Sequence, residues 1–157
     1  MEIGVLADTH VTSFEDIPRK IIDRLSRVDL IIHAGDFIAV NVLNGLRGLG
    51  EVKAVLGNMD LAELENTLPT KEIIQIKKKR IGITHGSGPP WWELPRRVKK
   101  VFDQDQLDII IYGHSHEPYN EIIDGILFFN PGGAANTFGI LTIEDGIKGE
   151  ILSSQEW

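Results

Sequence analysis

Cysteine is absent from the 157-residue sequence. Its absence excludes disulfide scaffolds, thiolate zinc sites, iron–sulfur clusters and cysteine nucleophiles. Long apolar runs are absent too, because no segment reaches the roughly eighteen apolar residues that a membrane-spanning helix requires. The N-terminal residues lack the basic start and the long apolar stretch of a signal peptide. We therefore expect a cytoplasmic protein that does not associate with membranes.

Positive charge is in the minority: the sequence has 16 basic and 23 acidic residues, and its formal net charge is −7. A field of this sign repels nucleic acid unless basic groups cluster or bound metal ions reverse the charge locally, so a nucleic-acid partner is not indicated. The apolar fraction of 42% and the charged fraction of 25% are those of a folded soluble domain. We expect residues 1–157 to form a single domain.

In the first half of the sequence, short apolar runs alternate with amphipathic segments. The runs at residues 3–7, 29–33 and 52–56 are typical of buried strands. The spacing of apolar residues predicts helices around residues 21–28 and 39–49. This strand–helix–strand–helix–strand order predicts a parallel sheet with right-handed crossovers.

The second half has a different pattern. We expect strands at residues 73–76 and 81–84, joined across a solvated basic loop at residues 77–80. The apolar spacing predicts a helix over residues 93–103, and the apolar run that follows predicts a buried strand over residues 109–112.

Two Asp-Gly pairs follow, Asp124-Gly125 and Asp145-Gly146. Each pair lies between apolar runs, which predicts a tight hairpin of antiparallel strands. The chain therefore begins as a parallel arrangement and ends in antiparallel strands, so its predicted fold class is mixed α/β.

Five short segments carry residues that can bind metal, and each follows a predicted strand. They read Asp8-Thr9-His10, Gly35-Asp36, Gly57-Asn58, His85-Gly86 and Gly113-His114-Ser115-His116. The carboxyl ends of strands in a parallel α/β sheet form the usual ligand crevice, so these segments can deliver their side chains to one place. The candidate ligands are Asp8, His10, Asp36, Asn58, His85, His114 and His116.

This ligand set contains oxygen and imidazole nitrogen but no sulfur, which suits manganese, iron, zinc, nickel or cobalt. Seven ligands are too many for one ion that must also hold water and substrate. They suit two ions about 3.5–4 Å apart, bridged by a carboxylate and a hydroxide. Taken singly, Asp36 or Asn58 could be a turn or helix-capping residue, and alternating histidines also occur on exposed strands. The joint occurrence of all five segments favours the metal site.

The order of these motifs closely resembles that of the calcineurin-like metallophosphoesterase superfamily, and in particular its small single-domain prokaryotic phosphodiesterase branch. The resemblance extends from Asp8 to the turn Asn130-Pro131-Gly132-Gly133. It implies a four-layer αββα sandwich, with two mixed β-sheets flanked by helices, and a centre of two divalent ions. Manganese or nickel is favoured, with cobalt, iron or zinc possible. The family pattern implies that Asp8, His10 and His116 hold one ion, that Asn58, His85 and His114 hold the other, and that Asp36 bridges both.

One position departs from the pattern. Many relatives have a histidine directly after the motif asparagine, thought to protonate or stabilise the leaving group, whereas this sequence has Met59. A thioether cannot donate a proton. The departure favours substrates whose leaving oxygen needs little help or is assisted by metal or water. Asp60, the next residue, could orient a ligand or water, or could be a solvated loop acid.

The resemblance implies hydrolysis of a small phosphoester, in particular a phosphodiester, by attack of a metal-bridging hydroxide. Asp36, Asn58 and His85 would position the hydroxide and the phosphate. The alternative is a non-catalytic metal-binding scaffold or protein-interaction module on the same fold, although scaffolds of this kind tend to lose ligands and this chain retains all seven.

Two further features are open to more than one interpretation. His33 is expected to be a hydrogen-bonded core residue rather than a ligand. The pair Trp91-Trp92 could anchor the following helix, form an aromatic wall beside the metals, or provide a self-association patch for a homo-oligomer.

Overall fold

The computed structural model describes residues 1–89 and 91–155, except for the Trp91 side chain. Within these residues there are ten strands, four α-helices and two short 3₁₀ helices. In chain order they are β1 (Glu2–Leu6), η1 (Phe14–Asp16), α1 (Arg19–Leu25), β2 (Leu30–His33), α2 (Val40–Arg47), β3 (Val52–Ala54), α3 (Ala62–Glu65), β4 (Lys71–Ile76), β5 (Lys79–Thr84), η2 (Trp91–Glu93), α4 (Leu94–Val101), β6 (Ile109–Ile111), β7 (Tyr119–Ile123), β8 (Ile126–Asn130), β9 (Thr137–Ile143) and β10 (Ile147–Ser153).

The strands form two mixed sheets. The first has the order β10-β9-β1-β2-β3, in which β1, β2 and β3 are parallel, as the strand–helix alternation predicted. Strands β9 and β10 extend this sheet in antiparallel fashion. The second sheet has the order β4-β5-β6-β8-β7, with parallel β5, β6 and β8 between two antiparallel edge strands.

Two hairpin turns are confirmed and one loop is corrected. Strands β7 and β8 join at Asp124-Gly125, and β9 and β10 join across Asp145-Gly146. The hairpin expected between residues 73–76 and 81–84 is present, but its basic loop is shorter than the expected residues 77–80, because Lys79 already belongs to β5. The turn is Lys77-Lys78 alone, with φ of 47° and 70°. A two-residue turn with positive φ at both positions matches the twist of antiparallel strands, so the longer loop is unnecessary.

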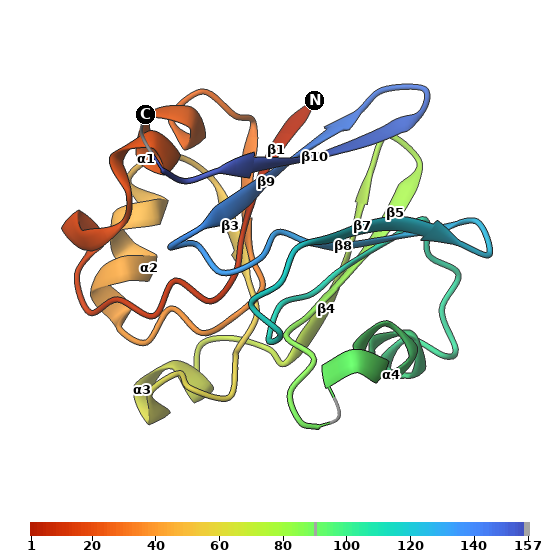
Figure 1. Ribbon diagram of the computed structural model, residues 1–157, viewed down its shortest axis with the longest axis horizontal. Helices are drawn as coiled ribbons and strands as arrows, with labels where there is room; N and C mark the ends of the chain where they lie inside the picture. The colour runs from red at the N-terminus through yellow and green to blue at the C-terminus, as the bar shows by residue number, and fades with distance from the viewer. Residues whose placement is uncertain (90, 156–157) are drawn as a thin grey trace.

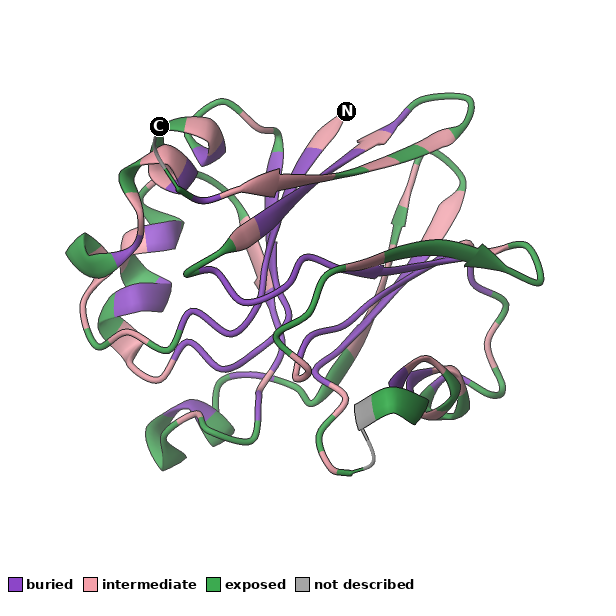
Figure 2. Cartoon of the chain, in the orientation of Figure 1, coloured by how far each residue is buried: buried purple, intermediate pink, exposed green. Residues whose placement is uncertain are grey.

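The buried residues fall into three layers of side chains, which define a four-layer sandwich (Figures 1 and 2). Inward-facing residues such as Ile3 and Ile109 fill the space between the sheets. The outer face of the first sheet packs against α1 and α2, and that of the second sheet packs against α4. In α4, Leu94 and Val98 lie one turn apart and are buried, which is the period expected of an amphipathic helix. The predicted αββα architecture is confirmed.

The ends of both sheets meet where the metal-binding motifs lie. On the first sheet, the Asp8 amide donates to the Gly35 carbonyl (3.0 Å), which joins the loops after β1 and β2. On the second sheet, the Gly113 amide donates to the His85 carbonyl (3.1 Å), which joins the loops after β5 and β6. Contacts of the Asp8 carboxylate with His85 and with the His114 amide join these two pairs of loops across the sandwich. None of the helices in the described part of the chain has the length and apolar character needed to cross a membrane.

Candidate metal centre

Left-handed backbone conformation is concentrated among the candidate ligands. Residues other than glycine adopt it at a cost of about 1–2 kcal/mol each. The candidate ligands with positive φ are Asp8 (52°), His10 (47°), Asp36 (63°), His114 (72°) and His116 (64°). Conformations of this kind persist only where the surrounding structure enforces them, and they gather at functional sites.

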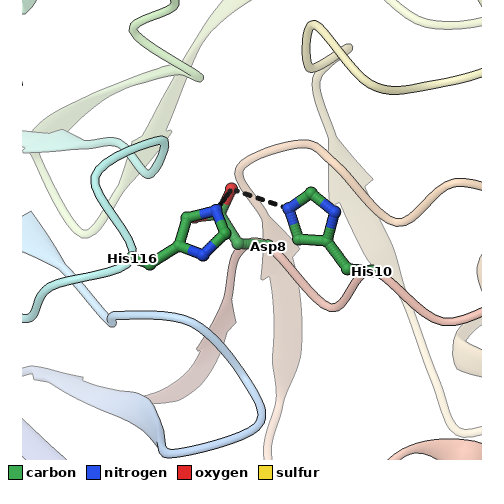
Figure 3. Close-up of side chains that lie close together, drawn as sticks. All are labelled: Asp8, His10 and His116. Carbon is green, nitrogen blue, oxygen red and sulfur yellow. Dashed lines mark ion pairs between the residues drawn. The ribbon is translucent and has the colours of Figure 1, made fainter.

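The Asp8 carboxylate lies at the middle of the cluster. Its Oδ1 atom is 3.7 Å from His10 Nε2, 3.7 Å from His85 Nε2 and 3.6 Å from His116 Nε2. Figure 3 shows the rings of His10 and His116 on two sides of this carboxylate. Its Oδ2 atom accepts the His114 amide at 3.0 Å, which links the first sheet to the loop after β6.

Asp36 lies between the same histidines. Its Oδ2 atom is 3.5 Å from His10 Nε2 and 3.1 Å from His85 Nε2, and its Oδ1 atom accepts the Met59 amide at 2.7 Å. Two groups of ligand atoms therefore lie close enough together to hold an ion. They are Asp8, His10 and His116, and Asp8, Asp36 and His85. Asp8 belongs to both groups.

Two buried atoms of this cluster lack a hydrogen-bond partner among the described residues: Asp8 Oδ1 and His85 Nε2. Leaving a buried polar atom unpaired costs about 1–3 kcal/mol. His85 Nδ1 lies 2.7 Å from the Ala34 carbonyl, so Nδ1–H donates there and leaves the Nε2 lone pair directed at the cluster. A cation between Asp8 Oδ1 and His85 Nε2 would satisfy both atoms, and the oxygen and imidazole donors suit the metals expected from the sequence.

The two carboxyl groups titrate differently. Burial raises the pKa of Asp8 to about 7. Burial also acts to raise the pKa of Asp36, but His85, the Met59 amide and His10 together outweigh it, and the pKa of Asp36 falls below its usual value. For His85 the order is reversed: burial acts to lower its pKa, but Asp36 and Asp8 raise it. Protons and metal ions therefore compete for the same buried atoms.

Two expected ligands lie at the margin of the cluster. His114 has its ring centroid 5.3 Å from that of His85, but its Nε2 atom accepts the Gly88 amide at 3.2 Å. Asn58 is exposed, and its Oδ1 atom accepts the Ser87 hydroxyl at 3.4 Å. The structure therefore brings together five of the seven expected ligands, while His114 lies against His85 and Asn58 contacts the loop that follows His85.

Residues behind the ligands hold the loops in place. His33 is fully buried, as expected of a hydrogen-bonded core histidine. Its Nδ1 atom accepts the Gly35 amide (3.1 Å), so its Nε2–H faces Thr9 Oγ1 (3.2 Å). Thr9 in turn donates to the Asp36 carbonyl (3.5 Å). His33 and Thr9 thus join the loops after β1 and β2, a role for Thr9 that the sequence pattern did not signal.

Asp60 does not face solvent as a loop acid. Its Oδ2 atom accepts the amides of Asp36 (2.9 Å) and Gly57 (2.8 Å), and its Oδ1 atom accepts the amide of Ile38 (2.8 Å). One carboxylate therefore fixes the loops that carry Asp36 and Asn58. No local pattern predicts the bonds to Asp36 and Ile38, because these partners lie 24 and 22 residues away.

Two residues singled out in the sequence, Met59 and Trp92, are exposed. Met59 is 54% exposed, and Trp92 is 69% exposed, so Trp92 is not a packing anchor for α4. The same expectations were made for Trp91, but its side chain lies outside the described residues. The helix is anchored instead by Leu94, which is 1% exposed.

Comparison with known proteins identifies the class. The model of the calcineurin-like phosphoesterase superfamily domain matches residues 1–146, and the chain belongs to this family. It is 34% identical to a probable metallophosphoesterase of Methanocaldococcus jannaschii, over 99% of this chain and 83% of the relative. It is 30% identical to phosphodiesterase MJ0936 of the same organism, over 97% of this chain and 99% of the relative.

Among solved structures, Vps29 of Entamoeba histolytica complexed with zinc is 26% identical. It has a TM-score of 0.77 and covers 99% of this chain and 100% of its own. The family, the fold and the candidate metal ligands agree on a metallophosphoesterase.

Proposed function

We propose that the protein is a phosphodiesterase that uses two divalent metal ions to hydrolyse a small phosphodiester. The observation that carries the proposal is the pair of overlapping ligand groups that share Asp8, at which two buried atoms have no hydrogen-bond partner among the described residues. The relative named as a phosphodiesterase supports the choice of a diester over a monoester.

In this proposal Asp8, His10 and His116 would hold one ion, Asn58, His85 and His114 would hold the other, and Asp36 would serve both. The proximity of Asp36 Oδ2 to both His10 and His85 supports the bridging role. Manganese or nickel is our favoured metal. When bound, the two ions would supply Lewis acidity, which neutralises phosphate charge and makes water acidic enough to act as a nucleophile at neutral pH.

The chain itself orients the reacting groups. The Ala34 carbonyl fixes the His85 ring, and the Met59 and Asp60 contacts fix Asp36 from the side chain and from the backbone. Asn58 is exposed at the edge of the cluster, where its amide can contact a phosphate oxygen. We assign Asp60 a positioning role, because its carboxylate binds the backbone of the ligand loops. With Met59 unable to donate a proton, the leaving oxygen takes its proton from water.

Charge also favours an anionic substrate once the ions are bound. The cluster contains two carboxylates, Asp8 and Asp36, and two divalent ions exceed their combined charge. A protein of net charge −7 can therefore present a locally positive site to a phosphodiester.

Hydrolysis of bis-p-nitrophenyl phosphate by protein reconstituted with Mn²⁺ or Ni²⁺ tests the proposal. We expect metal-dependent release of p-nitrophenol, with about two ions per chain by elemental analysis, and a loss on the order of 10³-fold in Asp36→Ala. Glu150→Ala, on an exposed part of β10, is the matched control and should keep full activity. Fully loaded protein that leaves this diester and simple monoesters intact would falsify the enzymatic proposal.

The second candidate, a metal-binding scaffold or interaction module, is supported by the exposed apolar side chains of Met59, Leu61 and Trp92. A scaffold of this kind would retain ions without hydrolysing any of these esters, so metal content and turnover measured on the same sample separate the two candidates.

A further inference from the structure

A pocket of about 380 Å³ opens beside the candidate metal centre, between α3 and α4. Two of the candidate ligands, Asn58 and His85, also line this pocket. Its volume is near the lower end of the range of about 300–1,000 Å³ typical of small-molecule sites. When a phosphate is bound at the ligand cluster, this pocket is therefore an adjacent space of limited size in which the leaving group can lie.

The apolar part of the pocket is aliphatic. Leu56, Val98 and Val101 contribute to its lining, and no Phe, Tyr or Trp side chain of the described residues does. Proteins that hold nucleobases stack them on aromatic side chains, at about 1–3 kcal/mol per base. Among the described residues, the ring in this lining is the His85 imidazole, whose nitrogens lie against the Ala34 carbonyl and the Asp36 carboxylate, so the pocket has no Phe, Tyr or Trp on which a base could stack.

The charged groups of the pocket are of opposite sign. Glu65 of α3 and Arg97 of α4 both line it. The Arg97 Nη2 atom donates to the carbonyls of Gly86 (2.8 Å) and Ser87 (3.2 Å), which fixes the guanidinium against the loop after His85. A third charged residue, Asp60, is engaged with backbone amides. The opposite charges do not favour a net charge on the occupant.

Neutral hydroxyl groups match this lining. A hydroxyl both donates and accepts, so one alcohol group can donate to the Glu65 carboxylate while another accepts from Arg97. The Ser87 hydroxyl, 3.4 Å from Asn58 Oδ1, adds a further polar group between the pocket and the ligand cluster.

We propose that this pocket holds the leaving group of the substrate, and that this group is a compact aliphatic polyol. The proposal rests on the phosphodiesterase function proposed above. In the reaction, the oxygen of water bonds to phosphorus, and the bond from phosphorus to the polyol oxygen breaks with its electron pair on that oxygen. The polyol oxygen then takes up the proton that water has lost, which yields a phosphomonoester and the free polyol.

Three methyl phosphodiesters that differ in their second alcohol test this specificity by kinetics. They are glyceryl methyl phosphate, octyl methyl phosphate and uridine 5′-methyl phosphate, followed by ³¹P NMR with Mn²⁺-loaded protein. We expect kcat/KM for the glyceryl ester to exceed the other two by at least about tenfold, the equivalent of one charge-assisted hydrogen bond. Equal values, or a preference for the octyl or uridine ester, overturn the polyol assignment.

Binding gives a readout that does not need turnover. Glycerol 1-phosphate is added to Zn²⁺-loaded protein, and the methyl resonances of Val98 and Val101 are expected to move while those of Ile151 stay in place. Val101→Trp, which fills the pocket from its 38% exposed edge, should weaken this binding about tenfold or more. Lys100→Trp is the control, because it adds the same ring to α4 at a residue outside the pocket lining.

Glu65→Gln keeps the shape of an exposed side chain and removes its charge, so it guards against misfolding of the tryptophan variant. We expect it to weaken glycerol 1-phosphate binding about tenfold. Unchanged binding in both pocket variants overturns the inference. If bis-p-nitrophenyl phosphate is hydrolysed but the glyceryl ester is not preferred, the pocket assignment alone fails. If no phosphoester is hydrolysed, the proposed function fails, and the methyl shifts still decide whether the pocket binds the polyol.

Discussion

Strand β5 begins at a hairpin turn and ends at the candidate metal centre, and residues near both ends have left-handed backbone. At its start, Lys77 and Lys78 have positive φ and are exposed. At the other end, Asp8 and Asp36 also have positive φ, but they are 3% and 2% exposed and lie against His85.

The difference lies in what enforces each conformation. At the hairpin, the twist of two antiparallel strands selects the turn, and solvent surrounds the side chains. At the ligand end, side-chain bonds from Thr9, His33 and Asp60 hold the loops, and the side chains converge on one point. The left-handed residues of the hairpin connect two strands, whereas those at the ligand end place side chains at the candidate metal centre. A substitution of the same kind should therefore have unequal effects in the two regions.

Glycine substitutions should give the largest contrast. Gly35, beside Asp36, has φ of 97°, and a Cβ there would lie 2.8 Å from the Gly57 backbone and 2.9 Å from His85 Nδ1. Gly125, in the β7–β8 hairpin, has φ of 80° with no heavy atom within 4 Å of a Cβ. We expect Gly35→Ala to lower the free energy of unfolding by about 3 kcal/mol or more, since overpacking adds to backbone strain. Gly125→Ala should cost about 1 kcal/mol. Urea unfolding of both variants measures the difference, and equal losses would remove the distinction between the regions.

Carboxylates that accept backbone amides allow a second comparison. Asp60 binds three amides at the ligand end, and Asp108 Oδ2 binds the Arg80 amide (2.8 Å) near the start of β5. Residues that orient metal ligands typically contribute about 10–100-fold to metal affinity, so we expect a loss of that size in Asp60→Ala. Asp108→Ala should lower stability without changing metal affinity. Isothermal titration of metal into each variant is the measurement, and similar affinities in the two variants would contradict the positioning role of Asp60.

The sequence alone predicts where the candidate ligands gather, but it does not predict which bonds hold their loops in place. Apolar periodicity predicted the parallel strands, and strand ends predicted that Asp8, Asp36 and His85 would converge. The hairpin between β4 and β5 was expected, but the shortness of its turn was not, because neither Lys77 nor Lys78 carries the local signal that Asn-Gly or Asp-Gly supplies. The bonds of Asp60 depend on how closely the loops after β2 and β3 approach, which only the packed structure determines.

The buried histidine behind the ligand loops makes the stability depend on pH. Burial, and then the charge of His85, lowers the pKa of His33 from 6.5 to about 3. Below pH 6.5 the unfolded chain takes up a proton at His33, while the folded chain does not until pH falls to about 3. Its contribution to stability is therefore fully present above pH 6.5 and is lost as pH falls, at up to about 1.4 kcal/mol per pH unit.

Metal-free wild-type protein and His33→Gln, unfolded in urea between pH 7 and pH 4, isolate this contribution. The carboxylates of the cluster titrate in both proteins, so the difference between the two curves belongs to His33. We expect the wild type to lose stability more steeply. Parallel curves would mean that His33 takes up a proton in the folded state as readily as in the unfolded chain.

The smallest effect is expected at the hairpin, and it has the opposite sign. Lys78 has φ of 70° and an exposed side chain, so Lys78→Gly removes a Cβ that opposes the left-handed conformation and disturbs no buried contact. We expect the free energy of unfolding to rise by about 1 kcal/mol. Gln75→Gly, at an exposed position of the neighbouring strand β4, should instead lower it by about 0.5–1 kcal/mol, because glycine weakens an extended strand. Thermal unfolding of the pair decides the point. A loss of stability in Lys78→Gly would show that the lysine side chains, and not only the strand twist, hold this turn.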